Sequence, residues 1–259
     1  MNKPTETVAT SRPTVGRRLV PMQPSLEHSI WFEEQNFAFI YLPKVACTSW
    51  KLHLWQASGH AIPADLEYSD VHNPKRLALP YVDQMAREQQ QAFLHKLDLG
   101  QLTAMAVIRD PRSRVLSAYL DKILFHSNPL SKFSRNVLPA IQTCFGLVAE
   151  QRPSFEQFLR WNQAELDARR WNPHWRPMVH LLGHTKRLQL WPMEQLDSAV
   201  QAVNKRFNCN LSFPKQQVLG PRQTYKSQTQ LEQYYGPLEQ TLVNEMYRDD
   251  LELHAALVA

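Results

Sequence analysis

The chain has 259 residues, of which 43% are hydrophobic and 10% aromatic, enough to bury one sizeable core and to predict a single domain. Lys and Arg number 29 against 24 Asp and Glu, so the net charge of +5 favours an anionic ligand and is too small to indicate a nucleic-acid-binding protein. Only seven glycines stand against 18 prolines, and neither GxGxxG nor GxxxxGK occurs, which argues against a glycine-rich nucleotide loop.

Residues 1–26 are rich in Pro, Thr, Ser and Arg and contain few apolar residues, which predicts a mobile N-terminal arm ahead of a domain at 27–259. The N-terminus lacks the hydrophobic region of a signal peptide, and no later stretch is apolar for long enough to cross a bilayer. The cysteines Cys47, Cys144 and Cys209 are isolated, offer no metal-binding spacing and allow at most one disulfide. These features predict a cytoplasmic protein without a transmembrane segment.

The first predicted elements of the domain are a strand and a helix. Residues 37–42 form a short apolar run, typical of a strand buried on both faces, and residues 48–56 fit the helix that follows. A loop that enters a helix presents unpaired backbone N–H groups, and the helix dipole favours an anion in front of them. The chain therefore offers an anion site between this strand and this helix.

The composition of that loop suits a bound anion. Small residues let a ligand approach the backbone, the Thr and Ser hydroxyls add donors, and a lysine adds positive charge. The residues concerned are Lys44, Ala46, Cys47, Thr48 and Ser49. The same pattern also fits an ordinary turn between a strand and a helix, with a solvated lysine and a capping Ser or Thr.

Farther along the chain, residues 81–97 predict an exposed helix and residues 102–108 a second buried strand. Asp110 and Pro111 follow this strand as the expected cap and first residue of another helix.

Two residues of this second junction suit a phosphate. Arg109 ends the strand and offers a planar fork of donors, and Ser117 lies about two turns into the helix with its side chain leaning back towards the N-terminus. Both are predicted to hold one anion, whereas Arg114 is interpreted as a surface charge.

The remaining pattern completes the fold prediction. We expect a short strand at 187–191 and further helices at 155–163, 194–207 and 228–247. Strands that alternate with helices indicate an α/β fold of three layers with a mainly parallel sheet, in which ligands bind beyond the carboxyl ends of the strands. The Lys44 and Arg109 segments are the two strand ends. Two such sites suggest a ligand with two separated phosphate-like groups.

The segments LPKVACTSWK and IRDPRSRVLSAYLDK resemble the 5′-phosphosulfate loop and the 3′-phosphate motif of sulfotransferases that use 3′-phosphoadenosine 5′-phosphosulfate (PAPS). The resemblance is to the carbohydrate sulfotransferases that modify chondroitin and dermatan, and more weakly to the uronyl 2-O-sulfotransferases. NPHWRPMVHLL, LQLWPMEQLDSAV and YYGPLEQTLVNEMYRDDLEL agree in order, so the similarity spans roughly residues 37–253. It implies a P-loop-like α/β fold, a sulfotransferase domain at 27–259 and PAPS as co-substrate, with no metal.

The resemblance also implies roles for individual residues. Lys44 would contact the bridging and sulfuryl oxygens, residues 46–49 the 5′-phosphate, and Arg109 with Ser117 the 3′-phosphate. A loop that closes over the nucleotide would be GPRQTYKSQ, with Arg222 and Lys226 as basic contacts.

A hydroxyl acceptor needs a base, and histidine is the usual choice near neutral pH. His72 lies between the first helix and the second strand, where the uronyl enzymes place a histidine base, and is the predicted base. His53 suits a core or surface position, and His174 suits packing or acceptor contact. Asp70 and Glu67 are the reserve bases.

The predicted acceptor is a glycan hydroxyl, and several side chains would suit an acidic polysaccharide. The basic candidates are Lys75, Arg76, Arg112, Lys122, Lys132 and Arg135, and the stacking candidates are Trp55, Trp161, Trp171 and Trp175. Scattered charges are more often a solvated face, and tryptophans are more often core. A nucleotide-sugar, a lipid-linked sugar or a small hydroxylated acceptor stays open.

Two other classes of function and one other location stay open. The function classes are a nucleoside-phosphate kinase, against which the missing GKS/T motif argues, and a non-catalytic glycan- or nucleotide-binding protein on the same scaffold. The other location is that of the soluble part of a Golgi-type enzyme. The sequence leaves the oligomeric state undetermined.

Overall fold

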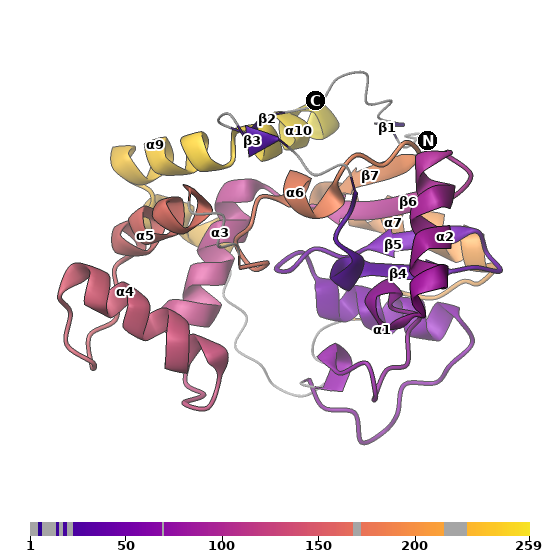
Figure 1. The fold of residues 1–259 in the computed structure, drawn as a ribbon, viewed down its shortest axis with the longest axis horizontal. Helices are drawn as coiled ribbons and strands as arrows, with labels where there is room; N and C mark the ends of the chain where they lie inside the picture. Colours follow the sequence, from indigo (N-terminus) through magenta and orange to yellow (C-terminus); the bar gives the residue numbers. More distant parts are fainter. Residues whose placement is uncertain are drawn as a thin grey trace.

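The computed structural model describes residues 23–68, 70–167, 172–214 and 227–259, and the backbone of three two-residue strands nearer the N-terminus. A five-stranded sheet in the order β1-β7-β6-β5-β4 forms its centre (Figure 1). The strands are β1 (Thr5–Glu6), β4 (Ser29–Phe32), β5 (Phe37–Ile40), β6 (Thr103–Ile108) and β7 (Leu188–Pro192). β5, β6 and β7 are parallel, whereas β4 and β1 pair antiparallel at the two edges.

Helices flank the sheet, and a group of helices lies at one end of the molecule (Figure 1). The helices are α1 (Cys47–Ala57), α2 (Arg87–Asp98), α3 (Pro111–Tyr119), α4 (Leu138–Phe145), α5 (Phe155–Asp167), α6 (Met178–Leu182), α7 (Leu196–Phe207), α8 (Leu231–Tyr234), α9 (Pro237–Met246) and α10 (Arg248–Val258). A small hairpin joins β2 (Thr14–Val15) and β3 (Arg18–Leu19). The predicted α/β fold with a mainly parallel sheet between helices is confirmed.

The predicted strands at 37–42, 102–108 and 187–191 correspond to β5, β6 and β7. Every residue of β5 and β6 is buried, because elements cover both faces of the sheet. This explains why both strands read as continuous apolar runs rather than as alternating patterns. β5 leads into α1 and β6 leads into α3, so the two predicted anion loops leave the same edge of the sheet.

The described residues form two main hydrophobic clusters. One packs around the sheet and includes Phe39, Trp50 and Trp191. The other lies among α3, α4, α5 and α9 and includes Tyr119, Phe158 and other large side chains. Since α3 begins at the end of β6 and packs into the second cluster, it connects the sheet to the helical part of the molecule.

Two predicted helices differ from the structure. The helix expected at 81–97 begins only at Arg87, because Tyr81 forms a bridge with β4 and a 3-10 turn (Val82–Gln84) follows. The helix expected at 228–247 is a 3-10 turn (Ser227–Gln230) followed by α8 and α9. Gly236 and Pro237 interrupt it, because Pro237 lacks the N–H that a continuous helix needs.

Several elements had no counterpart in the prediction, among them β4, α4, α6 and α10. β4 has only four residues, all buried, so it shows no alternation, and α6 has only five residues. The boundary predicted at residue 26 stays a prediction, although the Ser25 N–H donates to the Leu181 carbonyl at 2.9 Å.

Candidate active site

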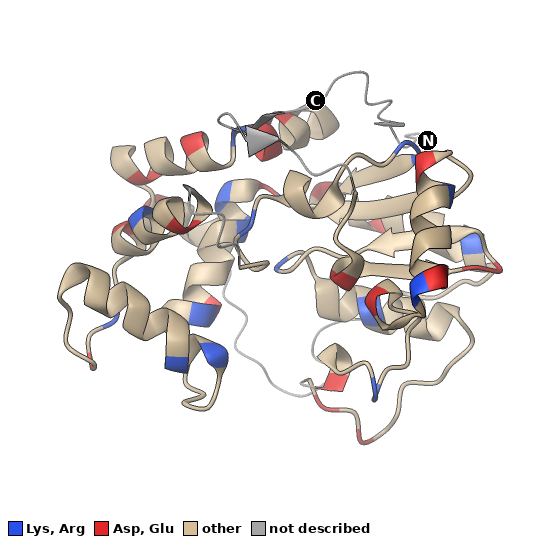
Figure 2. Ribbon diagram, viewed as in Figure 1, with Lys and Arg blue, Asp and Glu red and all other residues tan. Residues whose placement is uncertain are grey.

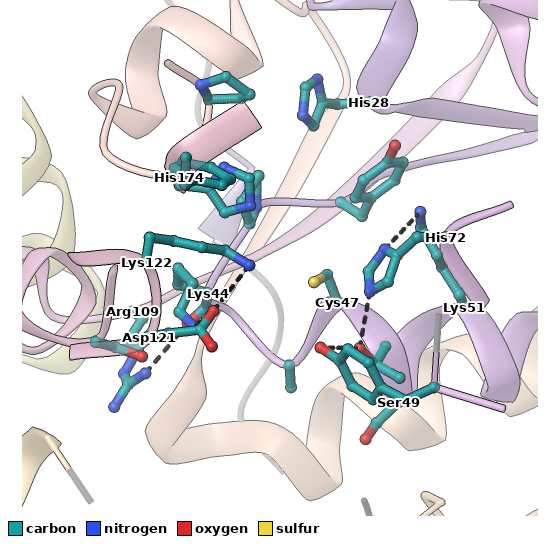
Figure 3. Close-up of a pocket in the computed structure, with 18 residues that line it drawn as sticks. His28, Lys44, Cys47, Ser49, Lys51, His72, Arg109, Asp121, Lys122 and His174 are labelled. Atoms are coloured by element: carbon teal, nitrogen blue, oxygen red, sulfur yellow. Dashed lines mark hydrogen bonds and ion pairs between the residues drawn. The ribbon is translucent and has the colours of Figure 1, made fainter. Parts of the chain in front are cut away.

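A pocket of about 580 Å³ lies beside the loops that leave β5 and β6 (Figure 3). Every predicted site residue that the structure describes lines this pocket. These residues are Lys44, Ala46, Cys47, Thr48, Ser49, His72, Arg109 and Ser117. Arg222 and Lys226 lie outside the described residues. The structure therefore brings the two predicted anion loops together in one cavity.

The backbone of the first loop has an unusual conformation. Lys44 (φ 69°) and Ala46 (φ 49°) both adopt the left-handed region, although neither is glycine. Alternation between left-handed and right-handed residues turns successive N–H groups towards one point and makes a concave anion site. No side chain caps the N-terminus of α1, which begins directly after Ala46. The loop thus offers backbone donors to a ligand without glycine.

The Lys44 ammonium group forms an ion pair with Asp121 at 3.0 Å, and Lys122 contacts the same carboxylate oxygen at 3.0 Å. Burial lowers the pKa of Lys44, although Asp121 acts in the opposite direction. Burial opposes ionisation of Asp121, but the two lysines outweigh it and hold the pKa of that carboxyl below its usual value. Sequence reasoning did not identify Asp121, although its spacing of four residues from Ser117 places both on one helix face.

Arg109 lies under the first loop and connects it to a distant segment. Its guanidinium donates to the Lys44 carbonyl at 3.1 Å and to the Ser227 hydroxyl at 2.8 Å. Ser117 is buried in α3 and lines the same pocket. Ser227 was not identified from the sequence, because no local pattern marks a residue that meets Arg109 across 118 positions.

His72 lies over the start of α1. Its Nε2 is 3.2 Å from the Thr48 hydroxyl, and its Nδ1 is 3.5 Å from the Lys51 ammonium group (Figure 3). The His72 residue is exposed to the pocket, and the protein that surrounds the imidazole, followed by the positive charges of Lys51, Lys122 and Lys44, holds its pKa below the usual value of a histidine. The imidazole is therefore neutral at pH 7, the form that a base requires.

Two other histidines line the pocket, and one has a fixed tautomer. Asn172 Oδ1 accepts the backbone N–H of His174 at 3.0 Å and also contacts His174 Nδ1 at 2.9 Å. Since that oxygen accepts, Nδ1 donates and Nε2 carries the lone pair. Burial lowers the pKa of His174 well below its usual value. The other is His28, whose Nδ1 is 2.9 Å from the Ser25 hydroxyl.

The remaining base candidates lie elsewhere. Asp70 accepts the Glu67 backbone N–H at 3.1 Å and pairs with Arg76 at 3.4 Å. His53 is buried against the rings of Trp50 and Phe213. Asp70 and His53 therefore make structural contacts, and neither residue lines the pocket.

The interpretation of Arg114 as a surface charge is wrong. Only 1% of Arg114 is exposed, and its guanidinium donates to the carbonyls of Pro43, Pro173 and Arg176 at 3.0, 3.0 and 2.8 Å. It thereby ties the Lys44 loop to the segment that carries His174. Asp110 caps α3 as predicted, since its carboxylate accepts the N–H groups of Arg112 and Ser113.

The predicted glycan-contacting residues are dispersed. Basic residues are scattered over both the sheet part and the helical part of the described chain (Figure 2), and Lys122 is the member of the predicted group that lines the pocket. Trp175 is buried in the helical cluster, 5.2 Å from Phe158 between ring centroids. Trp55 stacks on His60, and Trp171 lies outside the described residues. A tryptophan platform therefore has no support from Trp175 or Trp55.

Five other lining residues escaped sequence reasoning, and each contacts a partner distant in sequence or lies in an unremarkable stretch: His28, Tyr41, Lys51, Tyr68 and Phe133. Lys51 is 3% exposed, and its ammonium group lies 4.0 Å from the Tyr41 ring centroid. Burial lowers the pKa of Lys51 to about 8. Its only sequence signal was that it closes the segment LPKVACTSWK.

Within the described ranges, no group of three or more His, Cys, Asp or Glu residues is placed to hold a metal ion. The three cysteines are free.

The chain is similar to known proteins along most of its length. A family model described as the sulfotransferase family matches residues 27–255. Carbohydrate sulfotransferase 14 of Danio rerio is 27% identical over 159 residues, which cover 60% of this chain and 41% of that protein. Carbohydrate sulfotransferase 14 of Homo sapiens is 26% identical over 157 residues (60% and 39%), and carbohydrate sulfotransferase 12 of Xenopus laevis 25% over 214 residues (73% and 50%). No solved structure is significantly similar.

The aligned part of this chain spans half or less of the length of these relatives. The predicted cytoplasmic location is wrong, because the relatives are carbohydrate sulfotransferases, which fit the alternative of a Golgi-type enzyme better. Among the described residues, no helix is both long and apolar enough to span a membrane.

The family match includes both anion loops and the segment that carries His174, so it covers the whole described pocket. From the order of its motifs and the family match over residues 27–255, the chain belongs to the sulfotransferase family.

Proposed function

We propose that this protein transfers the sulfuryl group of PAPS to a hydroxyl group of a carbohydrate. The observation that carries the proposal is the meeting of the β5–α1 and β6–α3 loops at one pocket in a chain of the sulfotransferase family. Each loop suits one phosphate-like group, and PAPS carries such groups at its 5′ and 3′ positions. The names of the relatives support a carbohydrate acceptor.

The proposed roles in donor binding follow the resemblance to the family. Residues 46–49 hold the 5′-phosphate through backbone N–H groups at the start of α1 and through two hydroxyls. Arg109 and Ser117 hold the 3′-phosphate, and Lys44 contacts the bridging and sulfuryl oxygens. Arg222 and Lys226 are proposed basic contacts to the nucleotide.

Sulfuryl transfer, like phosphoryl transfer, requires mainly alignment of the reactants and stabilisation of charge on the leaving group. Lys44 supplies positive charge at the leaving phosphate. We propose His72 as the base that takes the proton of the acceptor hydroxyl, since its imidazole is neutral at pH 7 and faces the pocket. For this step the Thr48 hydroxyl turns to the phosphate and the Lys51 ammonium group leaves Nδ1 of His72. The imidazole then takes the tautomer with its proton on Nδ1 and its lone pair on Nε2.

A kinase is disfavoured, since the chain belongs to the sulfotransferase family and lacks the GKS/T motif. The non-catalytic alternative is also disfavoured, because Lys44 and a neutral histidine line one pocket. A non-catalytic protein would bind the nucleotide without transferring the sulfuryl group.

Binding and transfer test the proposal separately. Calorimetry in EDTA should find binding of 3′-phosphoadenosine 5′-phosphate, and adenosine 5′-monophosphate should bind at least about tenfold more weakly because it lacks the 3′-phosphate. Equal affinities, or no binding of the bisphosphate, would contradict the proposed donor site.

The transfer assay uses PAPS labelled in the sulfuryl group and a panel of unsulfated chondroitin, dermatan and simple sugars. Label should enter a carbohydrate with the wild-type protein and not with Lys44→Ala. Binding of the bisphosphate without transfer to any acceptor would favour the non-catalytic alternative.

A further inference from the structure

Asp121 accepts two lysines at a single atom. The ammonium groups of Lys44 and Lys122 each lie 3.0 Å from Oδ2 of Asp121 (Figure 3). All three side chains are largely buried, with exposures of 16% for Lys44, 19% for Lys122 and 12% for Asp121. The oxygen of Asp121 thus marks a point in the pocket where two cations hold one anionic oxygen.

The backbone explains how Lys122 reaches this point. Asp121 and Lys122 lie in a π-helical turn (Leu120–Leu124) that continues α3. Such turns are rare in proteins as a whole, but those that occur are often found at functional sites. The Lys122 ammonium group also lies 5.2 Å from the ring centroid of Phe133, which restricts its position. Lys122 is therefore held against the pocket.

A structural ion pair would not need this arrangement. One lysine is enough to neutralise Asp121, and a second ammonium group on the same oxygen repels the first, more strongly in a buried site than in water. The group as a whole carries one net positive charge where the pocket is open to a ligand. An excess of positive charge in a pocket is typical of a site that receives a further anion.

Lys44 is already the proposed contact to the sulfuryl and bridging oxygens. Because Lys122 contacts the same oxygen of Asp121 as Lys44, its ammonium group lies beside the same place in the pocket. We propose that Lys122 is a second catalytic cation, which contacts an oxygen of the sulfuryl group together with Lys44. Asp121 is the positioning residue, and its Oδ2 occupies the place of that oxygen in the free protein. This inference rests on the proposed function and goes beyond it, since it assigns a residue of the β6–α3 segment to the reacting group.

The acceptor oxygen forms a bond to sulfur, and the bond from sulfur to the bridging oxygen breaks. Its electron pair leaves with the 5′-phosphate, and the hydroxyl proton moves to the base. Negative charge grows on the leaving phosphate, so two ammonium groups at the sulfuryl and bridging oxygens lower the barrier more than one.

The test compares two nucleotides that differ only in the sulfuryl group. Calorimetry with PAPS and with 3′-phosphoadenosine 5′-phosphate is carried out on the wild-type protein, Lys122→Met and Lys122→Arg. The matched control is Lys205→Met, which removes an exposed lysine of α7. We expect Lys122→Met to bind PAPS about tenfold more weakly and the bisphosphate within about threefold of wild type, because the lost contact involves the sulfuryl group.

The variant Lys122→Arg keeps the positive charge and provides a second readout. It should bind PAPS within about threefold of the wild-type affinity. Equal effects on both nucleotides, or no effect on either, would overturn the role of Lys122 while leaving the proposed function intact. A wild-type protein that binds neither nucleotide would overturn both. If Lys122→Met does not fold by circular dichroism, Lys122→Gln carries the same expectations.

Discussion

At the scale of single residues, Lys44 combines a strained backbone with a paired, largely buried charge. Its backbone is left-handed, and its ammonium group is held 3.0 Å from Asp121. The residue thus has a fixed position before any ligand binds. Once the sulfuryl oxygen has replaced Oδ2 of Asp121, a lysine held in place in this way needs less reorganisation in the transition state than a mobile surface lysine.

Lys44→Ala should lower the rate of sulfuryl transfer at saturating PAPS by about 10²- to 10³-fold, the usual cost of removing one preorganised contact to developing charge. Initial rates with labelled PAPS measure this. Lys96→Ala, at an exposed ion pair on α2, is the control and should keep the wild-type rate. A tenfold or smaller loss at Lys44 in a folded protein would contradict the assigned role.

The low pKa of His72 predicts the pH dependence of the reaction. Because the pocket walls and nearby lysines lower that pKa, the free protein holds the base in its neutral form at pH 7. We expect the acid limb of kcat/KM to lie below the pH of about 6.5 at which an ordinary histidine titrates, and kcat/KM to be level at pH 7.

Substitution tests the same residue directly. His72→Ala should lower the transfer rate by about 10²- to 10⁴-fold, with the nucleotide still bound. Wild-type turnover in a folded His72→Ala protein would show that another group takes the proton, and His174→Ala would then be the next variant.

At the scale of elements, α3 organises the site. Its N-terminus is capped by Asp110, its pocket face carries Ser117, and its buried face carries Arg114. The Arg114 guanidinium donates to three backbone carbonyls of the two segments that carry Lys44 and His174. One helix thereby fixes the distance between the donor loop and the His174 segment.

Arg114→Met should destabilise the protein by about 3–5 kcal/mol, because three buried carbonyls lose their donors and Asp250 loses a nearby positive charge. Urea unfolding measures the change. Arg112→Met, at an exposed position of the same helix, should change stability by less than about 0.5 kcal/mol. Similar unfolding midpoints for the two variants would exclude a stabilising role for the three hydrogen bonds of Arg114.

At the scale of the whole molecule, the pocket lies between the sheet cluster and the helical cluster, and the buried histidine His28 lines it. Burial, followed by the charges of Lys51, Arg176 and Arg114, lowers the pKa of His28 to about 4. The unfolded chain, with a histidine pKa near 6.5, binds more protons than the folded protein between these values. Stability is therefore expected to rise with pH in this window.

Acidification from pH 7 to pH 4 should thus lower the free energy of unfolding, by at most about 3 kcal/mol for His28. Urea titrations at several pH values measure the slope, and His28→Gln should reduce it. An equal slope in the variant and the wild type would show that His28 does not contribute to the pH dependence of stability.

We also propose residues 27–259 as the unit that folds as one domain.

Much of the fold follows from local patterns. The apolar runs of β5 and β6, the cap at Asp110 and the proline at 111 are read from neighbours in sequence, and they place both anion loops at one sheet edge. The helix expected at 228–247 is also divided by a local signal, since Gly236 and Pro237 separate α8 from α9. Short buried elements such as β4 carry no period and could not be identified this way.

The sequence alone determined the two strand–loop–helix junctions, because strand burial, capping and small loop residues depend on adjacent positions. The tertiary structure decided which distant side chains meet there. Asp121 reaches Lys44 across 77 positions, and Arg114 meets Pro43 across 71. A buried charge finds its partner through packing, and packing depends on the whole chain rather than on any local pattern.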